Sequence, residues 1–160
     1  MDRKSILKRF EDELRESHEN YLQGNYIPFE KFKWDKHLVV REPRAKYRQD
    51  ETWTPVGLDP RFEFQIDSIE DYLVGELVNM SVAYKFKQKI EYKIEIITDY
   101  PETGTKISSL VDDISTGFEL TRRLTVNNYL IIYNYYKEDN FALITHVFHQ
   151  MQNYGKIFQE

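Results

Sequence analysis

The feature that most constrains the fold is a stretch of fifteen residues, 82–96, in which apolar and polar side chains alternate. Only Gln88 interrupts the apolar set, and the stretch contains no Gly, Pro or Asn that would mark a turn. A period of two over this length predicts one amphipathic strand of about 50 Å, with one buried and one solvated face. The apolar positions are Val82, Tyr84, Phe86, Ile90, Tyr92, Ile94 and Ile96.

The flanking regions predict the other elements of an α+β domain. An apolar stripe at helical spacing predicts a helix at 3–23, with Asp2 as its N-cap and Gly24 as its end. The further expected elements are a strand at 62–66, helices at 68–79 and 105–118, and strands at 120–126, 129–136 and 141–151, the last favoured over a helix. Turns at 127–128 and 137–140 separate these three strands. We therefore expect a small, mostly antiparallel sheet that contains the long strand, with one or two helices packed on it and an N-terminal amphipathic helix.

The chain is expected to form a single domain, residues 1–160, in which a proline-punctuated connection at 25–61 joins the N-terminal helix to a body at 62–160. Within the connection, 31–48 holds seven basic and two acidic residues, whereas the whole chain has a net charge of −5. Within the connection, only residues 37–41 are expected to form a strand. Aromatic side chains among cations are typical of an interface, although a solvated loop would show the same charges. The expected contact residues are Lys31, Lys33, Trp34, Lys36, Arg41, Arg44, Lys46, Tyr47, Arg48 and Trp53.

Most kinds of catalytic site have no support in the sequence. The chain has no cysteine, which excludes disulfides, thiolate metal sites and cysteine nucleophiles, and it lacks glycine-rich phosphate loops and Gly-x-Ser-x-Gly. His146 and His149 stand three apart, so on a strand they point to opposite faces and cannot share a metal. We expect no enzyme activity, cofactor or metal. No apolar run approaches the roughly 20 residues of a membrane helix, and the charged start does not resemble a signal peptide.

The order of elements after residue 82 resembles the core of bacteriophage tail-terminator and neck proteins. The resemblance rests on the stretch 90–102, IEYKIEIITDYPE, followed by the expected helix at 105–118 and further strands, and it covers about residues 82–150. It implies a structural subunit of a virion that contacts copies of itself in a ring, usually a hexamer, at the head–tail junction, together with neighbouring assembly proteins.

Two other functions remain open. The first is a small acidic binding protein, such as an immunity protein or another inhibitor, that masks a basic toxin or nuclease surface. The acidic residues between 50 and 76, opposed only by Arg61, would supply its binding surface. Alternatively, 31–48 contacts nucleic acid, with lysines and arginines on phosphates and Trp34 or Tyr47 stacked on bases. The acidity of the chain disfavours nucleic acid as the main partner, and no membrane contact is expected.

Overall fold

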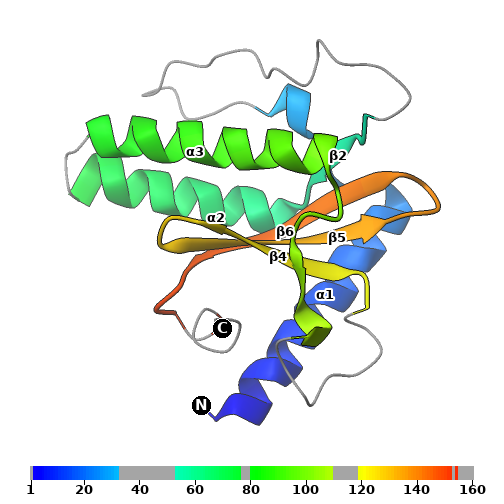
Figure 1. Cartoon of the computed structure of the whole chain (residues 1–160). Helices are drawn as coiled ribbons and strands as arrows, with labels where there is room; N and C mark the ends of the chain where they lie inside the picture. Colours follow the sequence, from blue (N-terminus) through cyan, green and yellow to red (C-terminus); the bar gives the residue numbers. More distant parts are fainter. Residues whose placement is uncertain (1, 33–52, 77–79, 110–118, 153, 155–160) are drawn as a thin grey trace.

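The structure is a computed structural model of the whole chain that describes residues 2–32, 53–76, 80–109, 119–152 and 154. Figure 1 shows its arrangement. The elements follow in the order α1 (Arg3–Gln23), β1 (Ile27–Pro28), the 3₁₀ turn η1 (Phe29–Lys31), β2 (Val56–Leu58), α2 (Pro60–Asp71), the π-helical turn η3 (Tyr72–Glu76), α3 (Met80–Asp99), β3 (Thr105–Lys106), the 3₁₀ turn η4 (Ile107–Ser109), β4 (Thr121–Val126), β5 (Tyr129–Tyr136) and β6 (Phe141–His149).

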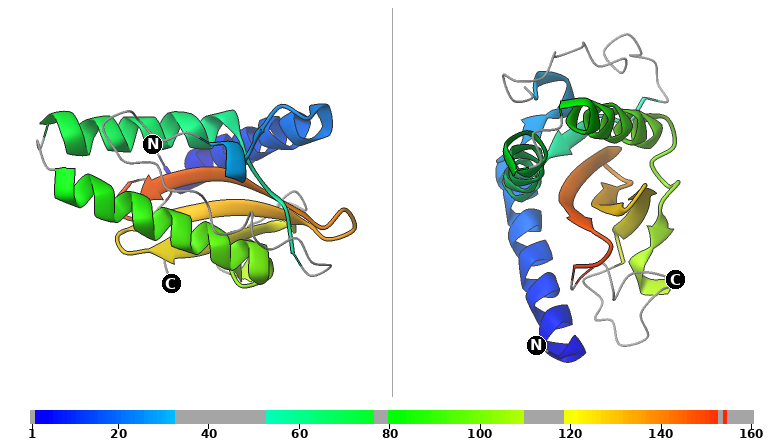
Figure 2. Two further views of the ribbon diagram at one scale, coloured as in Figure 1. Left: turned by 90° about the horizontal axis from the view of Figure 1, so that it is seen from above. Right: turned by 90° about the vertical axis from the view of Figure 1, so that its left-hand side faces the viewer.

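These elements form three layers around one sheet. The sheet has the order β1-β2-β6-β5-β4-β3, in which β2 and β6 are parallel and all other neighbours antiparallel. The hairpin of α2 and α3 covers one face, and α1 lies along the other (Figure 2). The expected α+β class, the mostly antiparallel sheet and the N-terminal helix are confirmed. None of the described helices combines the length and apolarity needed to span a membrane.

The long strand expected at 82–96 is wrong, because this stretch lies in the helix α3. Its apolar residues satisfy a helical period as well as a period of two. The helix also brings Lys87 Nζ to 3.4 Å from Glu91 Oε1, whereas four residues along a strand span about 13 Å. The stretch is longer than an ordinary strand, and its many Lys and Glu residues favour a helix. The apolar side chains buried along one side of α3 are Ala83, Phe86, Ile90, Ile94 and Ile97.

The strand expected at 62–66 is also wrong, because these residues form part of α2. The carboxylate of Asp59 accepts a hydrogen bond of 3.0 Å from the backbone N–H of Arg61, and Pro60 occupies the first turn. Asp followed by Pro is a strong start signal for a helix. The helix thus begins at Pro60 rather than at the capping box expected from residue 68, and Phe62 and Ile66 are buried one turn apart.

The meander of β4, β5 and β6 confirms the three strands expected near the C-terminus, including the strand assignment of 141–149. Asn127 and Asn140, at its two turns, have φ angles of 54° and 48°, a conformation that Asn tolerates well. The helix expected from residue 105 is not found. Thr105 and Lys106 instead pair with β4 at the sheet edge, and 107–109 form η4. Residues 110–118 lie outside the described residues, as does the expected strand at 37–41.

The buried side chains fall into two clusters, one on each face of the sheet. The main core lies between the sheet and the α2–α3 hairpin. Phe29 of η1 and Phe32, the residue that follows η1, also belong to it. A second, smaller cluster lies under α1. Its buried members are Phe10, Leu14, Ile107, Leu130, Ile132 and Phe148.

Candidate functional site

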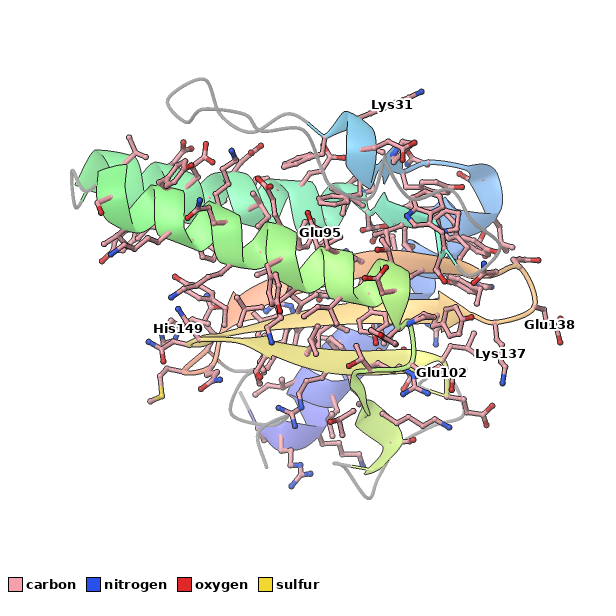
Figure 3. The ribbon with its side chains drawn as sticks, turned by 45° about the horizontal axis from the view of Figure 1, so that its top comes forward. Lys31, Glu95, Glu102, Lys137, Glu138 and His149 are labelled. Atoms are coloured by element: carbon pink, nitrogen blue, oxygen red, sulfur yellow. The ribbon has the colours of Figure 1, made fainter. Side chains whose placement is uncertain are left out.

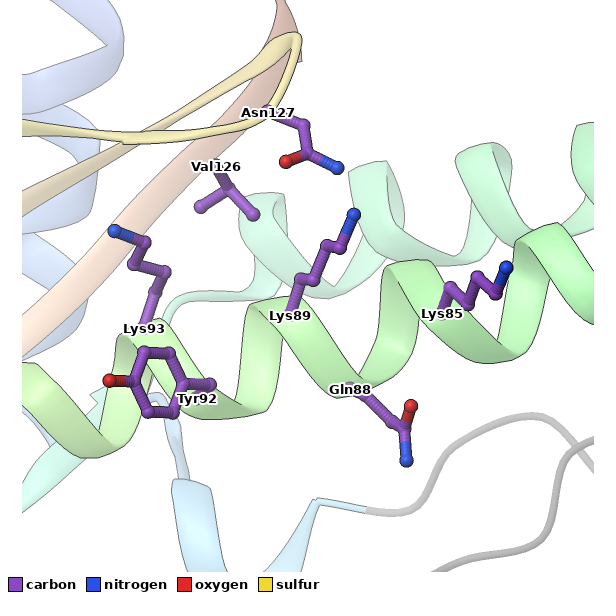
Figure 4. A pocket seen from close by; sticks show the side chains of 7 residues that line it. All are labelled: Lys85, Gln88, Lys89, Tyr92, Lys93, Val126 and Asn127. Atoms are coloured by element: carbon purple, nitrogen blue, oxygen red, sulfur yellow. The ribbon is translucent and has the colours of Figure 1, made fainter.

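A groove lies between α3 and the turn that joins β4 to β5 (Figure 4). It consists of two adjoining hollows of about 260 and 350 Å³. Such volumes suit a few side chains of a partner better than a large ligand. The residues that line it include Val82, Lys85, Phe86, Lys89, Lys93, Val126, Asn127, Tyr129 and His149.

Three lysines line the groove along α3. Lys85, Lys89 and Lys93 stand four residues apart, so successive turns of the helix bring their side chains to one side. Within the described part of the chain none of the three has an ion-pair partner, whereas in α1 Lys8 pairs with Asp12 and Arg15 with Glu11 one turn away. Three uncompensated ammonium groups in a row give this side of an acidic protein a local positive potential.

The floor of the groove is apolar. Phe86 and Val126 are buried, and the ring of Tyr129 lies 4.9 Å from that of Phe86 and 5.2 Å from the imidazole of His149, centre to centre. Burial raises the pKa of Tyr129, so its hydroxyl stays protonated at neutral pH. Val82 adds an apolar side chain that is 41% exposed at the rim. The groove therefore combines a hydrophobic floor with a cationic rim, which fits an amphipathic acidic segment of another protein.

Besides the groove, a cluster of polar side chains lies under α1 and joins that helix to the sheet. The carboxylate of Glu13 in α1 accepts hydrogen bonds of 2.9 Å from Nε2 of His146 and 3.0 Å from the hydroxyl of Tyr154. Its other oxygen lies 3.4 Å from a guanidinium nitrogen of Arg61. Nδ1 of His146 lies 2.8 Å from the hydroxyl of Thr145. A neutral His146 that carries its proton on Nε2 satisfies both neighbours.

The environment fixes the protonation of this cluster. His146 is 0% exposed, and burial lowers its pKa despite the carboxylate beside it. Burial tends to raise the pKa of Glu13, but the hydrogen bond from His146 and the positive charge of Arg61 outweigh it and lower that pKa. Burial and the same carboxylate raise the pKa of Tyr154. The cluster thus contains the Glu13 carboxylate, the neutral imidazole of His146 and the guanidinium of Arg61, and α1 covers it. Nε of Arg9, one turn away on α1, also lies 3.5 Å from the carboxylate.

The contact residues expected in the connection lie mostly outside the described residues; only Lys31 and Trp53 are described. Lys31 extends into solvent from η1 (Figure 3). Trp53 is half-buried, and its carbonyl accepts a hydrogen bond of 3.2 Å from the side chain of Asn140. The structure brings neither residue to the groove. The contact role of all ten residues stays a prediction.

Sequence reasoning missed both sites. The three groove lysines belong to the polar set of residues 82–96, which was assigned to the solvated face of a strand. In a strand they would not have faced the turn at Asn127. Glu13 and His146 are 133 residues apart, and no spacing in the sequence links them. In the described residues no group of three or more His, Asp or Glu side chains is placed to hold a metal ion.

The chain matches the model of a known protein family. The model of the ParE toxin of type II toxin–antitoxin systems, parDE, matches residues 56–154, which is more than half of the chain. The chain belongs to the ParE toxin family. No curated protein matches it. The matched region begins with β2 and ends at Tyr154, so α1, β1 and η1 lie outside the part that corresponds to the ParE toxin.

Membership of the ParE toxin family overturns several expectations. The resemblance to phage tail-terminator and neck proteins is wrong, and with it the structural role and the virion location. The acidic-inhibitor alternative has no specific support, because the matched family is that of the toxin and not of a protein that masks one. The general expectation of protein–protein interaction holds, since ParE toxins have antitoxin partners, but copies of this chain and phage assembly proteins are not the supported partners.

Proposed function

We propose that this chain is the toxin of a type II toxin–antitoxin pair, and that it acts by binding a target protein without catalysing a reaction itself. The observation that carries the proposal is the family match, which spans the parallel pairing of β2 with β6 and both helices of the hairpin. The polar cluster under α1 is the other candidate for chemistry. Its carboxylate is engaged by four neighbours and its imidazole is 0% exposed, which favours a structural role over catalysis.

The lysine-lined groove is the surface we propose for the antitoxin. A type II antitoxin is a protein that neutralises its toxin by direct contact. An antitoxin segment with apolar residues on one side and carboxylates on the other would place the former over Phe86 and Val126. Its carboxylates would then meet Lys85 and Lys89. Complementary charge speeds such association and makes it sensitive to salt.

The first experiment is induced expression in bacteria. We expect growth to stop after induction and to resume when the adjacent reading frame, the candidate antitoxin, is co-expressed. Gyrase, with which ParE toxins interact, is the first target to assay, by the supercoiling of relaxed plasmid in the presence of the purified protein. Unchanged growth at a verified protein level, together with normal supercoiling, would refute the toxin assignment.

The charge reversal Lys89→Glu tests the groove, with Lys137→Glu as its matched control. Lys137 lies in the turn between β5 and β6, at the end of the sheet opposite to His149 (Figure 3), and its side chain is 78% exposed. We expect Lys89→Glu to weaken antitoxin binding about tenfold or more at low salt, whereas Lys137→Glu leaves it unchanged. Equal affinities for the two variants would exclude the groove as the antitoxin site.

A further inference from the structure

The face of the sheet under α1 belongs to the part of the chain that matches the ParE toxin, but α1 itself does not. Leu130, Ile132 and Phe148 on this face all lie within residues 56–154, and their side chains are 0–4% exposed because α1 covers them. Without α1, the matched region would present these apolar side chains to solvent. A surface of this kind is a binding site for another polypeptide.

The packing of α1 is separate from the main core. Phe10 and Leu14 reach the second cluster only, whereas the α2–α3 hairpin packs on the opposite face. Neighbouring residues on β5 illustrate the division, since Leu130 belongs to the cluster under α1 and Ile131 to the main core. Release of α1 would therefore disrupt the smaller cluster and leave the larger one intact. Small, separate clusters are the parts of a protein that open at low free energy.

The surface under α1 selects a carboxylate at its centre. Arg61, His146 and Tyr154, which all lie in the matched region, converge on Glu13 within 3.4 Å. Two donors and a guanidinium around one position recognise an acidic side chain and disfavour a basic one. The surface thus combines apolar contacts with one defined charge, which is how an amphipathic helix is recognised in a groove.

The chain after α1 has a hinge and an anchor. Gly24 ends α1 with a φ angle of 71°, and a Cβ built there would meet no atom within 4 Å. Beyond it, β1 pairs with β2, and Phe29 of η1 is buried in the main core. Rotation about the residues near Gly24 would swing α1 away while β1 and η1 stay in place. It would also break the contacts of the last turns of α1, namely the hydrogen bond of Asn20 to Asp59 and the stacking of Tyr21 on Tyr136. The right-hand view of Figure 2 shows α1 as a separate arm along the outside of the sheet.

We infer that this sheet face is a helix-binding surface, that α1 occupies it within the free chain, and that a helix of the antitoxin with the same pattern replaces α1 there. The pattern is an apolar stripe with a carboxylate at its centre. The inference rests on the proposed function, because the antitoxin supplies the competing helix. It predicts that the site also accepts a free helix with the sequence of α1.

The test uses a fluorescent peptide of residues 2–24 of this chain as the probe. In the full-length Glu13→Arg variant, the introduced cation faces Arg61, so the chain's own α1 binds poorly and the surface becomes available. We expect this variant to bind the wild-type peptide at least tenfold more tightly than the wild-type chain does. Glu19→Arg is the matched control, since Glu19 lies on the exposed side of α1, and this variant should behave like wild type. A folded Glu13→Arg protein that binds no better than wild type would overturn the inference, and so would failure of this variant to fold.

A second measurement leaves α1 unchanged. Because the chain has no cysteine, Leu130→Cys and Ile131→Cys each introduce a single thiol. Both positions are 0% exposed, one under α1 and one under the hairpin. In native buffer we expect the thiol at 130 to react with a thiol reagent at least tenfold faster. Equal reaction rates of the two thiols would mean that both become accessible only when the whole protein unfolds, and this result would overturn the inference. Neither measurement involves growth arrest, so a failed toxin assignment and a failed α1 inference remain distinguishable.

Discussion

The hydroxyl of Tyr133 joins β5 to the loop after α3, and its removal should have a measurable cost. It donates a hydrogen bond of 2.8 Å to the carbonyl of Pro101 and accepts one of 2.9 Å from the N–H of Gly104. The side chain is 0% exposed, and burial raises its pKa to about 12, so the hydroxyl is neutral at any ordinary pH. Both hydrogen bonds are thus buried and intact in the native state.

The substitution Tyr133→Phe keeps the ring and removes the two hydrogen bonds. The N–H of Gly104 is then left without a partner at a buried position, which costs about 1–3 kcal/mol. The carbonyl of Pro101 is half-buried and regains part of its hydration. We therefore expect the free energy of unfolding to fall by about 2 kcal/mol. For a chain of this length that loss corresponds to a Tm decrease of roughly 4–8 °C.

Urea unfolding followed by circular dichroism measures this change, with Tyr135→Phe as the matched control on the same strand. The hydroxyl of Tyr135 donates only one long hydrogen bond, of 3.3 Å, to the side chain of Asn140. Its removal should cost less than about 1 kcal/mol. If the two variants lose the same stability, or if Tyr133→Phe stays within about 0.5 kcal/mol of wild type, the hydrogen bonds of Tyr133 contribute nothing net and the reasoning is refuted.

Three further predictions concern packing and pH. Phe10→Ala leaves a cavity under α1 and should lower the free energy of unfolding by about 3 kcal/mol in the same assay, a cost that an unchanged urea midpoint would contradict. Gly104→Ala would place a Cβ 2.8 Å from both the carbonyl of Arg123 and the hydroxyl of Tyr133, so thermal melting should show a clear loss of stability. Acidification should also destabilise the protein. The pKa of His146 is lower in the folded state than its ordinary value of 6.5, so below that pH the unfolded chain binds the proton more readily. The pKa of Glu13 is lower in the folded state than its ordinary value of 4.5, so its carboxylate favours the folded state above that pH. Stability is therefore lost as pH falls through these values, and urea midpoints that do not fall from pH 7.5 to 4 would contradict this.

Local signals in the sequence predicted the elements whose ends and turns carry distinctive residues. Asp2 and Gly24 bound α1, and Asn127 and Asn140 take the positive φ angles of the two turns between the C-terminal strands. The α3 stretch was assigned wrongly because its apolar residues satisfy two periods at once. The burial of α3 against α2 and the sheet, which no local pattern reveals, decides between the two periods.

Neither site could be located from the sequence, for different physical reasons. The groove depends on the helical conformation of α3, since only a helix places Lys85 and Lys89 on one side next to the turn at Asn127. The cluster around Glu13 depends on the docking of the N-terminal helix against the last strand, a contact between distant parts of the chain. Family membership rests on the match of residues 56–154 to the ParE toxin model.

The parallel pairing of β2 with β6 has a consequence for how the protein is made. Val56 lies opposite Ala142, and Leu58 opposite Ile144, so β2 gains its parallel neighbour only after the intervening helices and strands have left the ribosome. Until then α2 and α3 have no sheet to cover, and their apolar sides stay exposed. The lysine-lined groove also needs the completed turn between β4 and β5. A nascent chain is thus unable to present its finished binding surfaces until β6 has emerged, and any protein that neutralises it through those surfaces must meet it after that point.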